Sequence, residues 1–188
     1  PAMGSHGGGT VEGQLEVING YGITEEAMGV PILASMEVEL VGQMPDGTPI
    51  YCDKYAYNAD GIVLLNKVKP HTDFKGEHES GLLKMIAIGL AKHKGASWFH
   101  MQGFDTFAER IPIVAKEFLK KMNVVFGVGL VQNAYDEICL IEVMEKDKIV
   151  ERDHAMLMVA KERIAKLKFD NIDVLIVDKI GKNISGEG

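Results

Sequence analysis

The chain has 188 residues, of which 46% are hydrophobic and 25% are charged, and its net charge is −7. This composition is ordinary for a globular protein with a sizeable core, and the acidic balance argues against nucleic acids or anionic membranes as partners. No uncharged run approaches the roughly 18 residues of a membrane span, and no secretory signal pattern is present. Together with two separated cysteines, Cys52 and Cys139, these features predict a cytoplasmic protein with buried free thiols.

Hydrophobic periodicity predicts alternating helices and strands after a glycine-rich loop at residues 3–9. Thr10 is a candidate N-cap for a first helix that ends near residues 20–22. Further helices are predicted at 82–91, 104–122 and 152–167, and strands at 35–42, 49–55, 61–66, 124–129, 138–144 and 174–177. The alternation predicts an α/β fold, a mixed sheet flanked by helices. We expect one α/β domain over residues 1–188, the central part of a longer two-domain protein, with its last loop (181–188) truncated.

Lys84 is notable because its neighbours are apolar. A helix that is apolar all round is normally buried, so this lysine must reach solvent, find a partner or lose its charge by desolvation. The last outcome would give a neutral amine able to form a covalent bond to a ligand. The apolar neighbours are Leu82, Leu83, Met85, Ile86, Ala87, Ile88, Leu90 and Ala91.

Three histidines lie near glycine or proline turns: His6, His71 and His100. Polar loops after buried strands often carry the chemistry of α/β folds, and His71 follows the predicted strand 61–66. The spacing of the three matches no short zinc motif, so the fold would have to assemble any metal site. His78 and His93 have charged neighbours and are predicted to lie at the surface.

Four ordered motifs resemble the lactate racemase-like family, which comprises the nickel-pincer-nucleotide enzymes and their relatives of unassigned substrate. The motifs are MGSHGG at 3–8, NKVKPHTDF at 66–74, ESGLLKM at 79–85 and GKNISG at 181–186. The resemblance covers essentially the whole chain but corresponds only to the central part of a family member.

The resemblance implies an isomerase, a racemase or epimerase of 2-hydroxy acids that acts by transient hydride transfer. Lys84 would be tethered to the cofactor, the nickel-pincer nucleotide, Ni(II) pyridinium-3-thioamide-5-thiocarboxylic acid mononucleotide. His100 would be the protein ligand to nickel. His6 and His71 would act as acid and base on opposite faces of a small-molecule hydroxy acid.

The loop between His71 and Lys84 departs from the family's best-known racemases, which have a shorter, glycine-rich loop there. In this chain it carries Lys75, Glu77 and Glu79, so a larger or differently charged hydroxy acid is as good a candidate as lactate. Because the family's other binding residues lie outside this piece, we expect the isolated fragment to lack the cofactor and to show little or no turnover.

Two other functions remain open. Three histidines could bind zinc or iron directly and activate a water for hydrolysis, which requires three converging imidazoles. Alternatively, a non-catalytic domain could bind a ligand through the glycine-rich loop. The isomerase instead requires Lys84 and His100 to face one cleft, with His6 and His71 on either side. A homo-oligomer is also compatible with the sequence.

Overall fold

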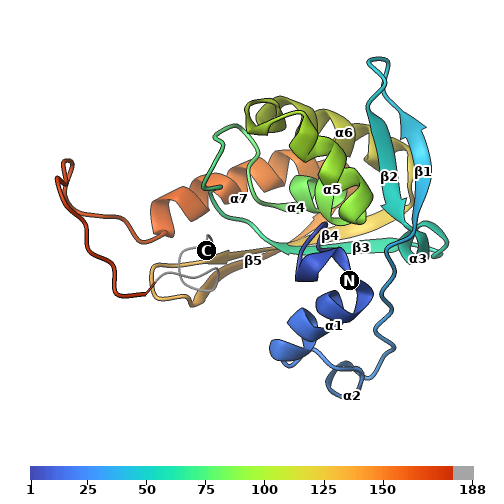
Figure 1. Cartoon of the computed structure of the whole chain (residues 1–188), viewed down its shortest axis with the longest axis horizontal. Coiled ribbons are helices and arrows are strands. Elements are labelled where there is room, and N and C mark those ends of the chain that lie inside the picture. The colour runs from blue at the N-terminus through green and yellow to red at the C-terminus, as the bar shows by residue number, and fades with distance from the viewer. Residues whose placement is uncertain (180–188) are drawn as a thin grey trace.

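The computed structural model describes residues 1–179, which form two sheets flanked by helices (Figure 1). Strands β1 (Val38–Gln43) and β2 (Pro49–Asp53) form an antiparallel pair. Strands β3 (Ile62–Lys67), β4 (Val124–Gln132) and β5 (Ile138–Glu145) form the second sheet in that order. The β3–β4 pair is parallel and the β4–β5 pair antiparallel, so the predicted mixed sheet is confirmed.

The helices lie on both sides of the β3-β4-β5 sheet (Figure 1). Helices α4 to α7 cover one face, against which the alternate side chains of Leu64, Val131 and Met144 are buried. Helices α1 and α2 lie on the other side. The helices are α1 (Val11–Gly20), α2 (Glu25–Met28), α3 (Lys54–Tyr57), α4 (Leu82–Lys84), α5 (Lys92–Met101), α6 (Phe107–Lys121) and α7 (Ile149–Arg163).

The core lies between the sheet and helices α4 to α7. The helical spacing predicted for α6 is confirmed, since Phe107, Ile111 and Phe118 are all fully buried. The methionine and alanine face of α7 also belongs to the core, through Met156 and Ala160. The carboxyl end of β3 and the amino end of α4 therefore meet at one edge of a well-packed core.

Helix α1 begins as its sequence predicts, and it supports the glycine-rich loop. The Thr10 hydroxyl accepts a hydrogen bond from the Gly13 amide over 3.1 Å, which caps the helix. Gly7 of the loop sits so close to the helix that a Cβ on Gly13 would overlap the Gly7 carbonyl oxygen. Only glycine at position 13 allows this close approach.

Two sequence-based predictions about burial are wrong. Residues 174–177 are not a buried strand: they are 58–87% exposed and lie outside every strand of residues 1–179. Their apolar composition suits a central strand, but no described strand pairs with them. Cys139 is exposed on β5, whereas Cys52 is buried on β2 as predicted. The predicted loop 181–188 lies outside the described residues.

The contact between Gly13 and Gly7 makes a testable prediction. Gly13→Ala should lower the free energy of unfolding by about 1–3 kcal/mol, because the added methyl group forces the loop off the helix. Gly20→Ala is the matched control, since a Cβ at position 20 of the same helix meets nothing within 4 Å. Urea unfolding should show the control at least as stable as the wild type, and equal losses in both variants would contradict the prediction.

Candidate functional site

Asp153 of α7 fixes the start of the helix that carries Lys84. One carboxylate oxygen accepts the Leu82 amide over 2.6 Å, and the other lies 3.1 Å from His78 Nδ1. Asp153 and His78 are only 1% and 4% exposed, so the prediction that His78 is a surface residue is wrong. Gly81 must be glycine here, because a Cβ would overlap the Asp153 carboxylate. A buried acid thus supplies the partner that the first amide of α4 needs.

Lys84 immediately precedes a π-helical turn, Met85–Gly89, in which the Leu90 amide donates to the Met85 carbonyl over 2.8 Å. Such turns are rare and occur frequently at functional sites. The side chain of Lys84 is half-buried, and its Nζ lies 5.9 Å from the centroid of the Phe74 ring. The amine therefore lies against an aromatic ring at the edge of the core rather than deep inside it.

His71 and His100 lie on the same aromatic cluster, formed by Phe74, Phe104 and Phe107. The His71 ring stacks on Phe74 with centroids 4.2 Å apart and lies 6.3 Å from Phe104. The His100 ring, exposed at the end of α5, lies 5.4 Å from Phe104 and 5.5 Å from Phe107. The fold thus brings Lys84, His71 and His100 to the rim of one cluster.

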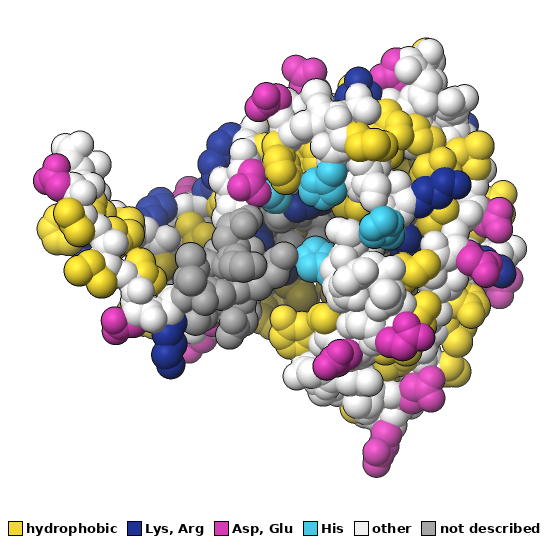
Figure 2. Space-filling model, viewed as in Figure 1, with side chains coloured by type: hydrophobic (Ala, Val, Ile, Leu, Met, Phe, Trp, Pro, Cys, Tyr) yellow, Lys and Arg dark blue, Asp and Glu magenta, His cyan; other side chains and the backbone are white. Residues whose placement is uncertain are grey.

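The loop that carries His6 packs on the helical segments that carry Lys84 and His100. The Gly4 amide donates to the Gly89 carbonyl over 3.2 Å, and Gly4 lies against Ile88 and Ala96. Ile88 lies four residues after Lys84, and Ala96 lies four residues before His100. Each separation corresponds to about 6 Å along a helix axis. Figure 2 shows histidine side chains gathered around a hollow on one face of the molecule.

The backbone partners of His6 and His71 favour opposite tautomers. Nδ1 of His6 lies 2.6 Å from the Met3 carbonyl oxygen, which can only accept, so this nitrogen carries the proton. Nδ1 of His71 accepts the Asp73 amide over 3.1 Å, which leaves the proton of the neutral ring on Nε2. We assign these tautomers from the hydrogen-bond partners. Neutral His6 then presents a bare Nε2, a proton acceptor, and neutral His71 a protonated Nε2.

Glu79 holds the loop that carries His71. Its side chain is fully buried, accepts the His71 amide over 2.7 Å and the Gly76 amide over 3.3 Å, and pairs with Lys161 of α7 at 2.8 Å. Burial alone would raise the pKa of the Glu79 carboxyl, but the Lys161 ammonium and the two amides outweigh it and lower the pKa. Glu79 is therefore held as a carboxylate.

Among the described residues, no group of three His, Cys, Asp or Glu side chains is placed to hold a metal ion. The hydrolase hypothesis requires three converging imidazoles, and the fold does not assemble such a set within residues 1–179. The isomerase hypothesis does not require three converging imidazoles, because its metal takes one ligand from the protein and the others from an organic cofactor.

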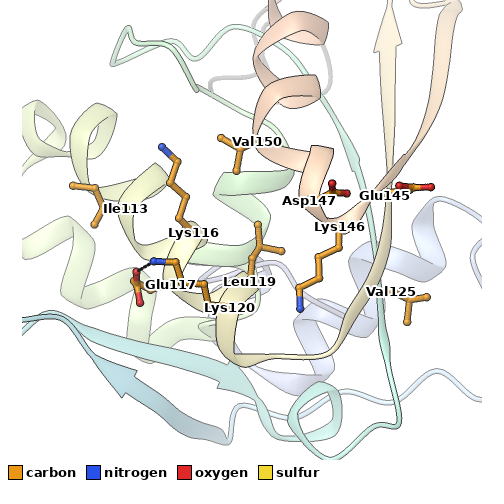
Figure 3. Close-up of a pocket in the computed structure, with 10 residues that line it drawn as sticks. All are labelled: Ile113, Lys116, Glu117, Leu119, Lys120, Val125, Glu145, Lys146, Asp147 and Val150. Atoms are coloured by element: carbon orange, nitrogen blue, oxygen red, sulfur yellow. Dashed lines mark hydrogen bonds and ion pairs between the residues drawn. The ribbon is translucent and has the colours of Figure 1, made fainter.

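A different groove, of about 800 Å³, lies at the amino end of β4 (Figure 3). Its apolar floor includes Leu119 and Val150, and its rim carries both signs of charge, with Lys120 paired to Glu117. Ligands of α/β folds bind beyond the carboxyl ends of strands, which is where His71 lies. The position of His71 therefore favours the aromatic cluster with its histidines, rather than this groove, as the candidate site.

Sequence reasoning missed the buried polar residues that hold the site: Gln14, Glu79, Lys92 and Asp153. One signal was available for Asp153, because it falls in the helical stripe of Ile149, Met156 and Ala160, where an acid is out of place unless it is bonded. Gln14 gave no such signal, because a glutamine on a short helix is ordinarily exposed.

Comparison with known proteins supports the fold. No protein-family model and no curated protein matches the chain. The chain is similar to the solved structure of the lactate racemase apoprotein from Thermoanaerobacterium thermosaccharolyticum, with a TM-score of 0.57 and 21% sequence identity. The chain has a lactate racemase-like fold. The match covers 76% of this chain and 37% of that one, so the chain spans little more than a third of the racemase structure.

The Glu79 anchor predicts a pH dependence of stability. Because folding lowers the pKa of Glu79, its carboxylate stabilises the folded state fully above the ordinary pKa of 4.5. This stabilisation is lost as the pH falls through the lower pKa of the folded state. Wild-type stability should therefore fall more steeply below pH 4.5 than that of Glu79→Gln. Urea unfolding across that range measures the difference. Glu77→Gln, an exposed neighbour, should follow the wild type, and identical profiles for wild type and Glu79→Gln would contradict the assignment.

Proposed function

We propose that this chain forms the core of a racemase or epimerase of 2-hydroxy acids. The observation that carries the proposal is the gathering of Lys84, His71 and His100 on one aromatic cluster, with the loop of His6 packed against the same helices. An amine and two imidazoles on one aromatic cluster, with a third imidazole on the loop packed against the same helical segments, match the four roles that such an isomerase needs. The racemase-like fold is a second, independent support.

The residues of this candidate site fit the nickel-pincer nucleotide. The half-buried Lys84 offers an amine at the edge of an aromatic wall, where a covalent attachment to a planar ring can form. The exposed imidazole of His100 can provide one nickel ligand from the protein. When bound, the nucleotide supplies an acceptor for the hydride on C2 of the substrate and returns it.

The two remaining histidines would move the substrate's hydroxyl proton. The bare Nε2 of His6 takes that proton as the C2–H bond breaks with its electron pair, which gives a transient 2-keto acid. When the hydride returns to the opposite face, the oxygen needs a proton from the other side, and Nε2 of His71 in its charged form provides it. In that form Nδ1 also carries a proton, and its partner becomes the Asp73 carboxylate, 3.7 Å away, instead of the Asp73 amide.

The substrate class follows from the loop beside His71. Lys75 Nζ donates to the His71 carbonyl over 2.7 Å, so a cation lies next to the acid–base histidine. We propose a 2-hydroxy acid larger than lactate, with additional polar groups that this charged loop would contact. Glycine-rich loops offer no such side chains.

Intact mass spectrometry tests the attachment. The full-length protein, co-expressed with the enzymes that synthesise the pincer nucleotide, should carry a mass addition that is absent from Lys84→Ala. Lys94→Ala is the control, because Lys94 is exposed on the neighbouring helix and lies over Tyr51 instead. Activity in a protein whose Lys84 is unmodified would refute the proposal.

Replacement of the acid–base histidines tests the chemistry separately. His6→Ala and His71→Ala should each lower the rate of racemisation by about 10²–10⁴-fold, while the mass addition on Lys84 persists. Lys94→Ala, which removes an exposed side chain that lies over Tyr51, should leave the rate near that of the wild type. A small effect of either His6→Ala or His71→Ala would remove that residue from the mechanism. Stereoisomer interconversion can be followed by chiral chromatography.

A further inference from the structure

We propose that Gln14 and Lys92 are positioning residues that clamp the loop of His6 over the site and fix the orientation of the His6 ring. The proposal deepens the proposed function, because it rests on His6 as the proton acceptor. Neither residue touches the hollow as described, so each would act through His6 and through the backbone that carries it.

Gln14 binds the backbone of the loop that carries His6. It is fully buried on α1, and its amide nitrogen donates to the Gly4 carbonyl over 3.0 Å and to the His6 carbonyl over 3.2 Å. Both carbonyls belong to the turn of residues 3–6, in which the His6 amide and the His6 ring both contact the Met3 carbonyl oxygen. One side chain thus fixes both ends of the segment that orients the imidazole.

Lys92 fixes Gln14 in turn. Its side chain is fully buried, and its ammonium donates to the Gln14 amide oxygen over 2.9 Å and to the Pro1 carbonyl over 2.5 Å. Asp53 of β2 lies 3.6 Å away and balances the charge. Burial lowers the pKa of Lys92, and the Asp53 carboxylate opposes that shift. Because the Gln14 oxygen is bound to a cation, its nitrogen must face the two carbonyls.

The position of Lys92 in the fold indicates more than a packing role. It follows the π-helical turn after Lys84 and starts α5, the helix that ends in His100, with a left-handed backbone (φ 54°) that few residues other than glycine adopt. A fully buried lysine is rare and costs free energy unless it is bonded. The clamp therefore connects the loop of His6 to the junction of the two elements that carry Lys84 and His100.

The sharpest test is Gln14→Glu. A glutamate keeps the shape of glutamine and still accepts from Lys92, so the fold is maintained, but it cannot donate to the Gly4 and His6 carbonyls. Nitrogen NMR of the His6 ring should change from a single tautomer, protonated on Nδ1, to a mixture. Amide exchange at Gly4, His6 and Gly9 should accelerate. Gln43→Glu, an exposed position on β1, is the matched control.

Turnover gives the functional readout. In the cofactor-loaded enzyme, Gln14→Glu should lower kcat by about 10- to 100-fold, the usual effect of a misplaced catalytic group, while KM and the mass addition on Lys84 stay unchanged. Lys92→Met should do the same, and Lys92→Arg should restore part of the rate. If the full-length, cofactor-loaded wild type proves inactive, the proposed function fails, yet the NMR and exchange measurements still decide whether the clamp exists.

Two outcomes would overturn the clamp. The first is a His6 tautomer and loop exchange in Gln14→Glu that match the wild type. The second needs no variant: in the wild type, the Gln14 side-chain amide protons should exchange far more slowly than those of Gln102, an exposed side chain at the end of α5. Equal rates would show that Gln14 is not bonded to the loop, and this comparison decides the question even if Gln14→Glu does not fold.

Discussion

The site depends on one constraint: a loop holds a side chain in place only if its backbone amides and carbonyls find partners away from water. Here three buried polar residues supply those partners. Asp153 binds the first amide of α4, Glu79 binds the His71 loop, and Gln14 binds the carbonyls that flank His6. Each is almost completely buried, so each bond forms where water does not compete.

The buried anchors also explain why the candidate site lies at one edge of the sheet. Helix α7 contributes both Asp153 and Lys161, the partner of Glu79, so a single helix on the sheet holds the amino end of α4 and the loop after β3. Helix α1 and Lys92 hold the glycine-rich loop from the other side. The two histidines proposed to act on substrate lie on irregular segments. Apart from Glu79, which lies in the same loop as His71, the side chains that hold these segments lie on helices.

The sequence predicted the parts of the fold that depend on local periodicity. The strands β1 to β5 and the helices α1, α6 and α7 follow from apolar spacing and from caps such as Thr10. Lys84, His71 and His100 could be selected from their neighbours, yet their proximity depends on ring contacts with Phe104 and Phe74 that spacing does not encode. His78 was wrongly predicted to be exposed because its sequence neighbours are charged. The partner that allows its burial, Asp153, lies 75 residues away in the sequence. Residues 174–177 were misjudged because an apolar run predicts a strand only where another strand can pair with it.

The central claim is that buried carboxylates hold these loops, and amide hydrogen exchange in the wild-type protein tests it most directly. The amides of His71, Gly76 and Leu82 lie in or next to an irregular segment, but each donates to the carboxylate of Glu79 or Asp153. They should exchange as slowly as amides in the centre of β4. Exchange at the rate of an unstructured chain at these three positions would contradict the account.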